Sequence, residues 1–343
     1  MKELQYIIRI PNHLGDCIMA QPAVRVLSRI AGDSTIGLVL PEWAEAIYKD
    51  IDNAELIFIP HRYLHGLKGI KYQTEILKKY RIETGILLTP SFSSALIFFL
   101  GDIKKRWGFA GQGRSFLLEP AVRGYDEFTL HRADKYRALL ETALDWRLNT
   151  GRPEIVPGGE AEEKAAQLLN ENGLTEQDKL IALAPQAVAE SRRWGTDNYR
   201  ALADRLTREW GYKIILLGSE AEFGAGEAVA KDNDSVVNLC GRTDIETAAA
   251  VLSRAALFVG NDSCLAHLAS AVDISLVVLS GADNPVETSP LSDKKTVIIK
   301  DYMDCISCVK NRCPRRGDDF MRCMTDIPVD EVFEAAKIYL NFQ

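Results

Sequence analysis

The 343-residue sequence lacks an apolar run long enough to cross a membrane. Its longest weakly polar stretch, Gly85 to Leu100, is interrupted by a proline and hydroxyl side chains, and it is shorter than the roughly 20 apolar residues of a spanning helix. We therefore expect a strand followed by a buried helix there. A signal-peptide pattern is also missing, because Arg9 stands within the first apolar segment. We expect a cytosolic chain.

An excess of positive charge is also missing. The formal net charge of -7 argues against a general nucleic-acid binder, which is usually built on a basic surface. An anionic partner must then be met by local basic clusters, and the first half of the chain holds two of them. Charge runs are usually solvated faces, but two in one half favour an anionic partner for that half. The clusters comprise Arg62, Lys68, Lys71, Lys78, Lys79 and Arg81 against Glu75, and then Lys104, Lys105, Arg106, Arg114 and Arg123.

The glycine-rich G-x-G-x-x-G turn of dinucleotide-binding proteins does not follow the first expected strand, Tyr6–Ile10. This disfavours a nucleotide-dependent oxidoreductase. The loop that does follow, Pro11-Asn12-His13-Leu14-Gly15-Asp16, stands at the carboxyl end of a strand, which is a usual ligand position in open α/β sheets. A carboxylate there can act as a general base, or Asp16 can simply cap a helix that begins near Cys17. Asn12 and His13 are the nearby alternatives.

Strand and helix patterns alternate along the whole chain, which predicts an α/β fold with parallel sheets. The length suits two domains, and the segment Asn149–Gly159 has the glycine and proline content of a hinge. We predict an N-terminal domain over residues 1–155 and a second over 156–328, with a cysteine-rich loop at 305–323. Residues 329–343 are expected to form a helix that packs back across the hinge. Two such halves place a ligand in the cleft between them.

A strand, tight turn and helix are predicted around Leu257-Phe258-Val259-Gly260-Asn261-Asp262-Ser263. Asp262 or Ser263 can cap the helix, and the backbone N–H groups of Ser263, Cys264 and Leu265 then suit a phosphate or diphosphate. The plainer interpretation is that Asp262 is only a cap and that His267 only packs on the helix.

Seven cysteines occur in a chain that we expect to be cytosolic, so disulfides are not the default. Four of them, Cys305, Cys308, Cys313 and Cys323, follow a C-x2-C-x4-C-x9-C spacing that predicts a tetrahedral structural zinc site. The alternatives are reduced buried thiols or a disulfide formed on oxidation. We expect Cys17 and Cys240 to be small core residues.

Four motifs in order make the chain resemble glycosyltransferase family 9, the ADP-heptose:lipopolysaccharide heptosyltransferases, and its type II members most. They cover nearly the full length. The motifs are Leu14-Gly15-Asp16, Arg106-Trp107-Gly108-Phe109 with Arg114, Ser191-Arg192-Arg193-Trp194, and Gly260-Asn261-Asp262-Ser263-Cys264-Leu265-Ala266-His267.

The resemblance implies the glycosyltransferase B architecture, in which two Rossmann-like domains face a central cleft. It also implies inverting transfer of L-glycero-D-manno-heptose from ADP-heptose to the lipopolysaccharide inner core, with no cofactor required. The acceptor is then phosphorylated Kdo-containing lipid A or an already heptosylated core. Such an enzyme works in the cytoplasm, peripherally and in transient contact with the inner-membrane surface. Alternatives are another nucleotide-sugar donor or a nucleotide-sugar-binding protein without catalysis.

The family's site residues map onto this sequence as follows. Asp16 matches the proposed base. Arg192 stands where the family usually has a lysine, so the phosphate contact is kept with altered geometry. Cys264 replaces a small residue, so only its backbone contact carries over, and Glu220 could replace Glu222 at the ribose. The donor site comprises Arg192, Arg193, Glu222, Asp262, Ser263, Cys264, Leu265 and His267, and the acceptor site comprises Asn12, His13, Arg62, Arg106 and Arg114.

Overall fold

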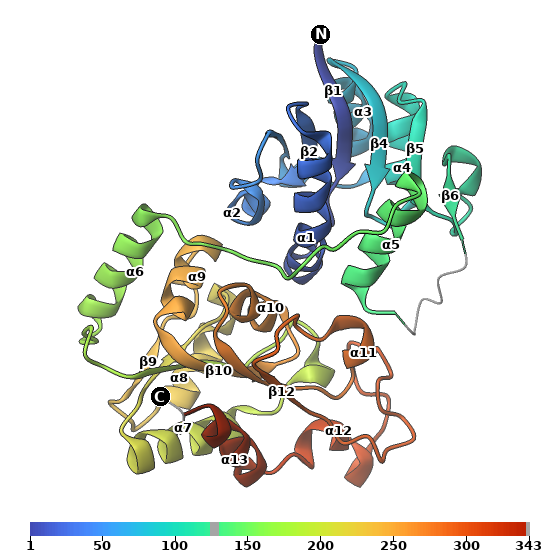
Figure 1. Ribbon diagram of the computed structural model, residues 1–343. Helices are drawn as coiled ribbons and strands as arrows, with labels where there is room; N and C mark the ends of the chain where they lie inside the picture. The colour runs from blue at the N-terminus through green and yellow to red at the C-terminus, as the bar shows by residue number, and fades with distance from the viewer. Residues whose placement is uncertain (124–129, 341–343) are drawn as a thin grey trace. The chain divides into compact units, whose positions relative to one another are not determined.

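The computed structural model describes residues 1–123 and 130–340. The chain forms two compact units, Met1–Pro153 and Glu154–Gln343, where we predicted a division between residues 155 and 156. Each unit is built around one six-stranded parallel sheet with helices on both faces (Figure 1). The two sheets have the same topology, in which the strand order reverses next to the first strand of the unit. That reversal is the usual ligand position of such sheets.

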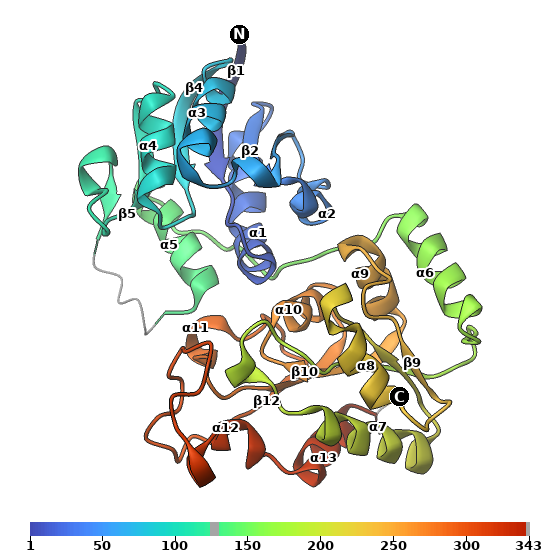
Figure 2. The ribbon, with the colours of Figure 1, turned by 180° about the vertical axis from the view of Figure 1, so that it is seen from behind.

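The first unit has the strand order β3-β2-β1-β4-β5-β6. Helices α1 and α5 pack together on one face, and α3 and α4 pack together on the other (Figures 1 and 2). The strands are β1 (Lys2–Arg9), β2 (Ile36–Pro41), β3 (Ala54–Ile59), β4 (Tyr80–Leu87), β5 (Lys105–Phe109) and β6 (Ala121–Val122). The helices are α1 (Leu14–Ala31), α2 (Glu45–Tyr48), α3 (Gly66–Leu77), α4 (Phe92–Leu100) and α5 (Arg132–Leu144), with 3-10 turns η1 (Glu42–Ala44), η2 (His61–Tyr63) and η3 (Ser115–Leu117).

The second unit repeats this topology with the order β12-β11-β10-β7-β8-β9. Its strands are β7 (Leu180–Ala184), β8 (Lys213–Leu216), β9 (Val236–Asn238), β10 (Ala255–Asn261), β11 (Ser275–Leu279) and β12 (Lys295–Ile298). Its helices are α6 (Gly159–Glu171), α7 (Thr196–Trp210), α8 (Phe223–Ala230), α9 (Ile245–Ser253), α10 (Cys264–Ala271), α11 (Pro285–Thr288), α12 (Arg322–Thr325) and α13 (Val329–Leu340). The 3-10 turns are η4 (Glu190–Arg192), η5 (Glu220–Glu222) and η6 (Gly317–Asp319).

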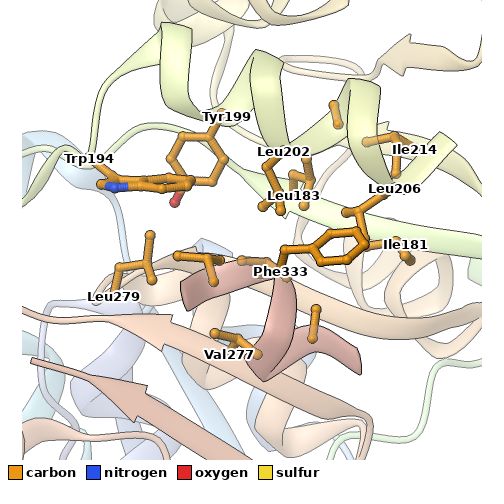
Figure 3. Close-up of a cluster of buried hydrophobic side chains, with 14 of the residues drawn as sticks. Ile181, Leu183, Trp194, Tyr199, Leu202, Leu206, Ile214, Val277, Leu279 and Phe333 are labelled. Atoms are coloured by element: carbon orange, nitrogen blue, oxygen red, sulfur yellow. The ribbon is translucent and has the colours of Figure 1, made fainter. Parts of the chain in front are cut away.

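The last helix, α13, packs on α7, β10 and β11 of its own unit. Its apolar face, which includes Val332, Phe333 and Ala336, joins the core between α7 and the sheet (Figure 3). Phe333 stacks on Trp210 with ring centroids 4.2 Å apart, and the Arg205 guanidinium lies 3.6 Å from its ring centroid. This face is therefore buried within the second unit, and packing of the helix back across the hinge stays a prediction. Residues 341–343 of the predicted helix lie outside the described residues.

Helix α4 also differs from the sequence-based expectation. The segment does form a strand and then a helix, and Phe98 is fully buried against β4. The helix as a whole is not buried, however. Phe99 and Leu100 are 50% and 43% exposed, because large apolar side chains lie on more than one side of α4 and only one side can face the sheet.

Candidate functional site

The carboxyl ends of β1 and β4 meet where the strand order of the first sheet reverses, and Asp16 follows β1 in the first turn of α1. The helix begins at Leu14 with His13 as its N-cap. The alternative role for Asp16, that of a helix cap, is therefore excluded. Its Oδ1 accepts a hydrogen bond from Arg132 Nη1 at 2.6 Å, and its side chain is 17% exposed. Arg132 opens α5, which packs beside α1. An oriented and partly accessible carboxylate within reach of a substrate hydroxyl is what a general base requires.

A buried arginine holds the loop before Asp16 in place. Arg9 is 2% exposed, and it donates to the carbonyl oxygens of Ile10 and Val39 at 2.7 and 3.2 Å. It also donates to Asn12 Oδ1 at 2.6 Å. Burial lowers the pKa of Arg9 to about 10, so it remains charged at neutral pH. Asn12 is therefore an anchored part of this loop, whereas His13 is exposed.

In the second unit, the loop after β7 carries Arg192 and Arg193 and is braced at several points. Trp194 is 1% exposed, its indole N–H donates to the Ile327 carbonyl at 2.8 Å, and its backbone N–H donates to Asn261 Oδ1 at 3.1 Å. Arg193 Nε donates to the Ala187 carbonyl at 2.8 Å. These contacts connect the loop that carries Arg192 and Arg193 to the end of β10. The backbone of both arginines is therefore held in place.

Arg192 forms an ion pair with Asp283, with Nη1 and Oδ2 2.6 Å apart. Asp283 is 5% exposed and lies in the loop after β11. The Nε atom of Arg192 is buried and makes no hydrogen bond to any residue that the structure describes. A buried arginine donor normally has a partner, so an anionic ligand at this position would complete its hydrogen bonding.

Asp262 directly follows β10 and is 3% exposed. Its Oδ2 accepts a hydrogen bond from Ser280 Oγ at 3.1 Å. Burial, and then the negative charge of Asp283, raise the pKa of Asp262 from 3.8 to about 7, although Ser280, Arg192 and Lys295 act in the opposite direction. Helix α10 begins two residues later, with Ser263 rather than Asp262 as its N-cap. His267 is buried on that helix.

This raised pKa predicts a pH-dependent stability. Between about pH 4 and about pH 7 the folded protein keeps a proton on Asp262 that the unfolded chain has lost, so this contribution to the free energy of unfolding falls as pH rises through the window. The slope is at most about 1.4 kcal/mol per pH unit. Asp262→Asn removes the titration, so we expect the variant to gain stability over the wild type as pH rises. Urea unfolding of both proteins at about pH 4 and about pH 7 measures the difference between their free energies of unfolding. A difference that does not change with pH would contradict the prediction.

Glu222 lies near the start of α10. Cys264 is exposed at its surface, yet desolvation by the protein around its thiol, and then the negative charge of Glu222, raise its pKa. The carboxylate also forms a capping box, because Glu222 Oε2 accepts from the Ser219 backbone N–H at 2.6 Å and from Ser219 Oγ at 2.9 Å. The structure thus brings Glu222, Cys264 and Asp262 to the same edge of the sheet, as expected for a nucleotide site. The ribose contact stays a prediction.

The basic residues predicted to bind an acceptor have different surroundings. Arg114 is 3% exposed, and its guanidinium donates to the carbonyls of Phe109 and Pro90. Arg106 donates to the carbonyls of Leu117, Ile103 and Lys104. Both therefore hold irregular backbone together. Arg62 is exposed, 4.9 Å from the ring centroid of Tyr63. Acceptor binding by all three stays a prediction.

The four late cysteines are free and partly exposed. Burial and then the charges of the other three thiols raise the pKa of Cys323 to about 11, so the four lie in one neighbourhood. As they stand, no three His, Cys, Asp or Glu side chains among the described residues are grouped closely enough to hold a metal ion. A structural zinc here would need these side chains to move, and it stays a prediction.

Two solved structures share the fold over nearly the whole chain. The ADP-heptose lipopolysaccharide heptosyltransferase II of Escherichia coli matches with a TM-score of 0.81 at 24% identity, covering 99% of both chains. A family 9 glycosyl transferase from Veillonella parvula matches with a TM-score of 0.84 at 21% identity, covering 100% of this chain and 98% of that one. By its fold, the protein has the glycosyltransferase B architecture.

Sequence comparison identifies the family. The sequence model of the family described as glycosyltransferase family 9 (heptosyltransferase) matches residues 73–317. The chain belongs to this family, and it is a glycosyltransferase. Lipopolysaccharide heptosyltransferase 2 of Salmonella typhimurium is 30% identical over 301 residues, covering 84% of this chain and 86% of the relative. Its namesake in Escherichia coli K12 is 29% identical over 305 residues, with the same coverage.

Sequence reasoning did not find Arg132, Asp283 or Lys295. Arg132 pairs with a carboxylate 116 positions away, and Asp283 lies outside the four motifs that carry the family resemblance. The one available signal was position, since Asp283 follows an apolar strand as Asp262 does. Lys295 affects Asp262 only because β12 lies beside β11.

Proposed function

We propose that the protein transfers heptose from ADP-heptose to the inner core of lipopolysaccharide, with inversion at the anomeric carbon. The names of its relatives and of its fold neighbour support the donor and the acceptor class. The observation that carries the chemistry is the ion-paired carboxylate of Asp16 at the strand-order reversal of the first sheet. The first unit then binds the acceptor and the second binds the donor.

Asp16 is the proposed general base. The acceptor hydroxyl gives its proton to the carboxylate while its oxygen forms a bond to the anomeric carbon and the bond to the diphosphate oxygen breaks. Arg132 holds Oδ1, so the second oxygen, Oδ2, is the proposed proton acceptor. The same ion pair fixes the orientation of the carboxylate before the acceptor arrives.

Charge develops on ADP as it leaves, and fixed donors in the second unit are proposed to stabilise it. Arg192 supplies an unused, buried Nε–H, and the first turn of α10 supplies backbone N–H groups at its positive end. Asp262 and Glu222 are proposed to bind hydroxyl groups of the heptose and the ribose. In this scheme arginine and the helix terminus do the work that a divalent cation does elsewhere.

The acceptor in this proposal is anchored in a membrane by its lipid A moiety. Among the helices that the structure describes, none combines the length and the apolar character needed to cross a bilayer. We place the reaction at the cytoplasmic face of the inner membrane, with the protein bound peripherally and transiently. Phosphorylated Kdo-containing lipid A and a core that already carries one heptose are the two acceptors to compare.

The direct test is ADP release from ADP-heptose by the purified protein, with truncated acceptors that end in Kdo or in a first heptose. Release only with the heptose-terminated acceptor establishes type II specificity, and release only with the Kdo-terminated acceptor establishes type I. A catalytically impaired Asp16→Asn variant is the background control. ADP binding without release in either mixture overturns the proposed donor and acceptor pair and directs the search to other nucleotide sugars.

A further inference from the structure

Helix α4 has an apolar outer face that the fold leaves uncovered. The helix, Phe92-Ser93-Ser94-Ala95-Leu96-Ile97-Phe98-Phe99-Leu100, contains no charged residue. Its inner side is fully used, since Ala95 and Phe98 are completely buried. On the outer side, Phe92, Phe99 and Leu100 remain 41%, 50% and 43% exposed. A surface helix of a soluble protein usually carries polar residues on that side.

The turn η3 extends this apolar face. Phe116 is 77% exposed, and its ring lies 6.4 Å from that of Phe92. Four large apolar side chains therefore share one surface, which we call the α4 surface: Phe92, Phe99, Leu100 and Phe116. Single exposed apolar residues are ordinary, but a contiguous group on one helix and its neighbouring turn marks an interaction site.

Positive charges outnumber negative ones around the α4 surface, where Glu75 and Glu83 pair with Lys71 and Lys105 and Asp102 is exposed just after α4. Helix α3 packs beside α4 (Figure 2). Together with the turn that follows it, α3 carries four exposed lysines, Lys68, Lys71, Lys78 and Lys79. Lys104 and Lys105 follow α4, and the Arg106 guanidinium lies 5.3 Å from the ring centroid of Phe99. Lys68, Lys78, Lys79 and Lys104 form no ion pair with any residue in the described ranges, although the protein carries a net charge of -7.

We infer that the α4 surface docks the protein on an anionic lipid bilayer, with its aromatic and leucine side chains in the headgroup region and the surrounding lysines on lipid phosphates. Apolar side chains flanked by lysines and arginines are the pattern of helices that lie in the membrane interface. The charge around the patch selects the partner, because a cationic rim on an acidic protein fits a negatively charged leaflet.

Other occupants fit the surface less well. A second copy of this chain would oppose two cationic rims across the contact, which disfavours a symmetric dimer through this face. A sugar phosphate would use the lysines but would leave the Leu100 and Phe116 side chains in water. The inference rests on the proposed function in one respect: an acceptor embedded in a leaflet requires the enzyme to work at that surface.

The test is flotation of the full-length protein with vesicles of phosphatidylethanolamine and phosphatidylglycerol, compared with vesicles of phosphatidylcholine alone. The variant Leu100→Ser with Phe116→Ser removes two apolar side chains from the α4 surface, and Lys79→Gln with Lys104→Gln removes two charges. We expect wild-type binding to the anionic vesicles, weakened by added salt, and a loss of about tenfold or more in the partition coefficient for each double variant.

Matched controls change equally exposed side chains elsewhere. Trp146 is 62% exposed after α5, and Lys231 is exposed after α8, so Trp146→Ser and Lys231→Gln should bind vesicles like the wild type. Transfer to a lipid-free acceptor should be unchanged in Leu100→Ser with Phe116→Ser. Vesicle binding requires no donor, so it succeeds or fails independently of the proposed heptosyl transfer. Unaltered binding by both double variants, equal binding to phosphatidylcholine, or a dimer that the apolar variant dissociates would overturn the inference.

Discussion

Asp16→Asn is expected to lower kcat for heptosyl transfer by about 10²- to 10⁴-fold, the range typical of a lost general base. Asparagine has nearly the same shape but cannot take the proton of the acceptor hydroxyl. Its amide oxygen can still accept the hydrogen bond from Arg132, so the loop and α1 should keep their positions. Because Asp16 lies in the first unit and the proposed donor groups lie in the second, ADP affinity should change by less than about twofold.

Steady-state ADP release gives kcat, and isothermal titration with ADP gives the donor-site affinity. Asp33→Asn is a matched control, since Asp33 is an exposed carboxylate just after α1. A further variant, His13→Ala, tests the other titratable side chain of the loop. Full activity in Asp16→Asn, together with a large loss in His13→Ala, would move the base to His13.

The sequence contained enough to predict the alternation of strands and helices in both units. The strand, tight turn and helix expected around residues 257–263 are present as β10 and α10, because a short apolar run flanked by turn residues allows few alternatives. The general place of the site was also predictable, since polar residues that follow parallel strands gather at one edge of the sheet.

The partners of the site residues were not predictable in this way. The Asp16–Arg132 contact depends on α5 packing beside α1, and the Arg192–Asp283 contact depends on β11 lying next to β10. Hydrophobic periodicity gives the face of an element but not its neighbour. Charge patterns have a similar limit. Arg114 was assigned to a basic cluster that could meet an anionic partner, yet it is buried and donates to the backbone carbonyl of Phe109.

Helix α4 shows where the pattern carries no information. When every position of a segment is apolar or small, periodicity cannot tell which residues face the core. Phe98 and Phe99 are neighbours of the same type, but one is fully buried and the other half exposed. Only the position of β4 decides between them.

Arg192→Ala is expected to lower kcat/KM for ADP-heptose by about 10²-fold, with weaker ADP binding as well. The variant removes the buried Nε–H that meets no described partner, and it leaves the carboxylate of Asp283 without the guanidinium 2.6 Å away. Arg192→Lys should recover a large part of the loss, because a lysine supplies the charge but not the planar fork. Donor kinetics and ADP titration, measured for both variants, separate charge from geometry.

The titration of Asp262 gives a second readout of the Arg192 charge, independent of donor binding. The arginine's charge lowers the pKa of Asp262, so its removal should move that pKa further above about 7. The pH at which stability stops falling should then rise in Arg192→Ala but not in Arg193→Ala, whose Nε is held by the Ala187 carbonyl. Asp283→Asn gives the opposite sign, because it removes a negative charge that raises the pKa of Asp262. Unaltered donor kinetics in Arg192→Ala would assign the diphosphate to Arg193 and the α10 terminus alone.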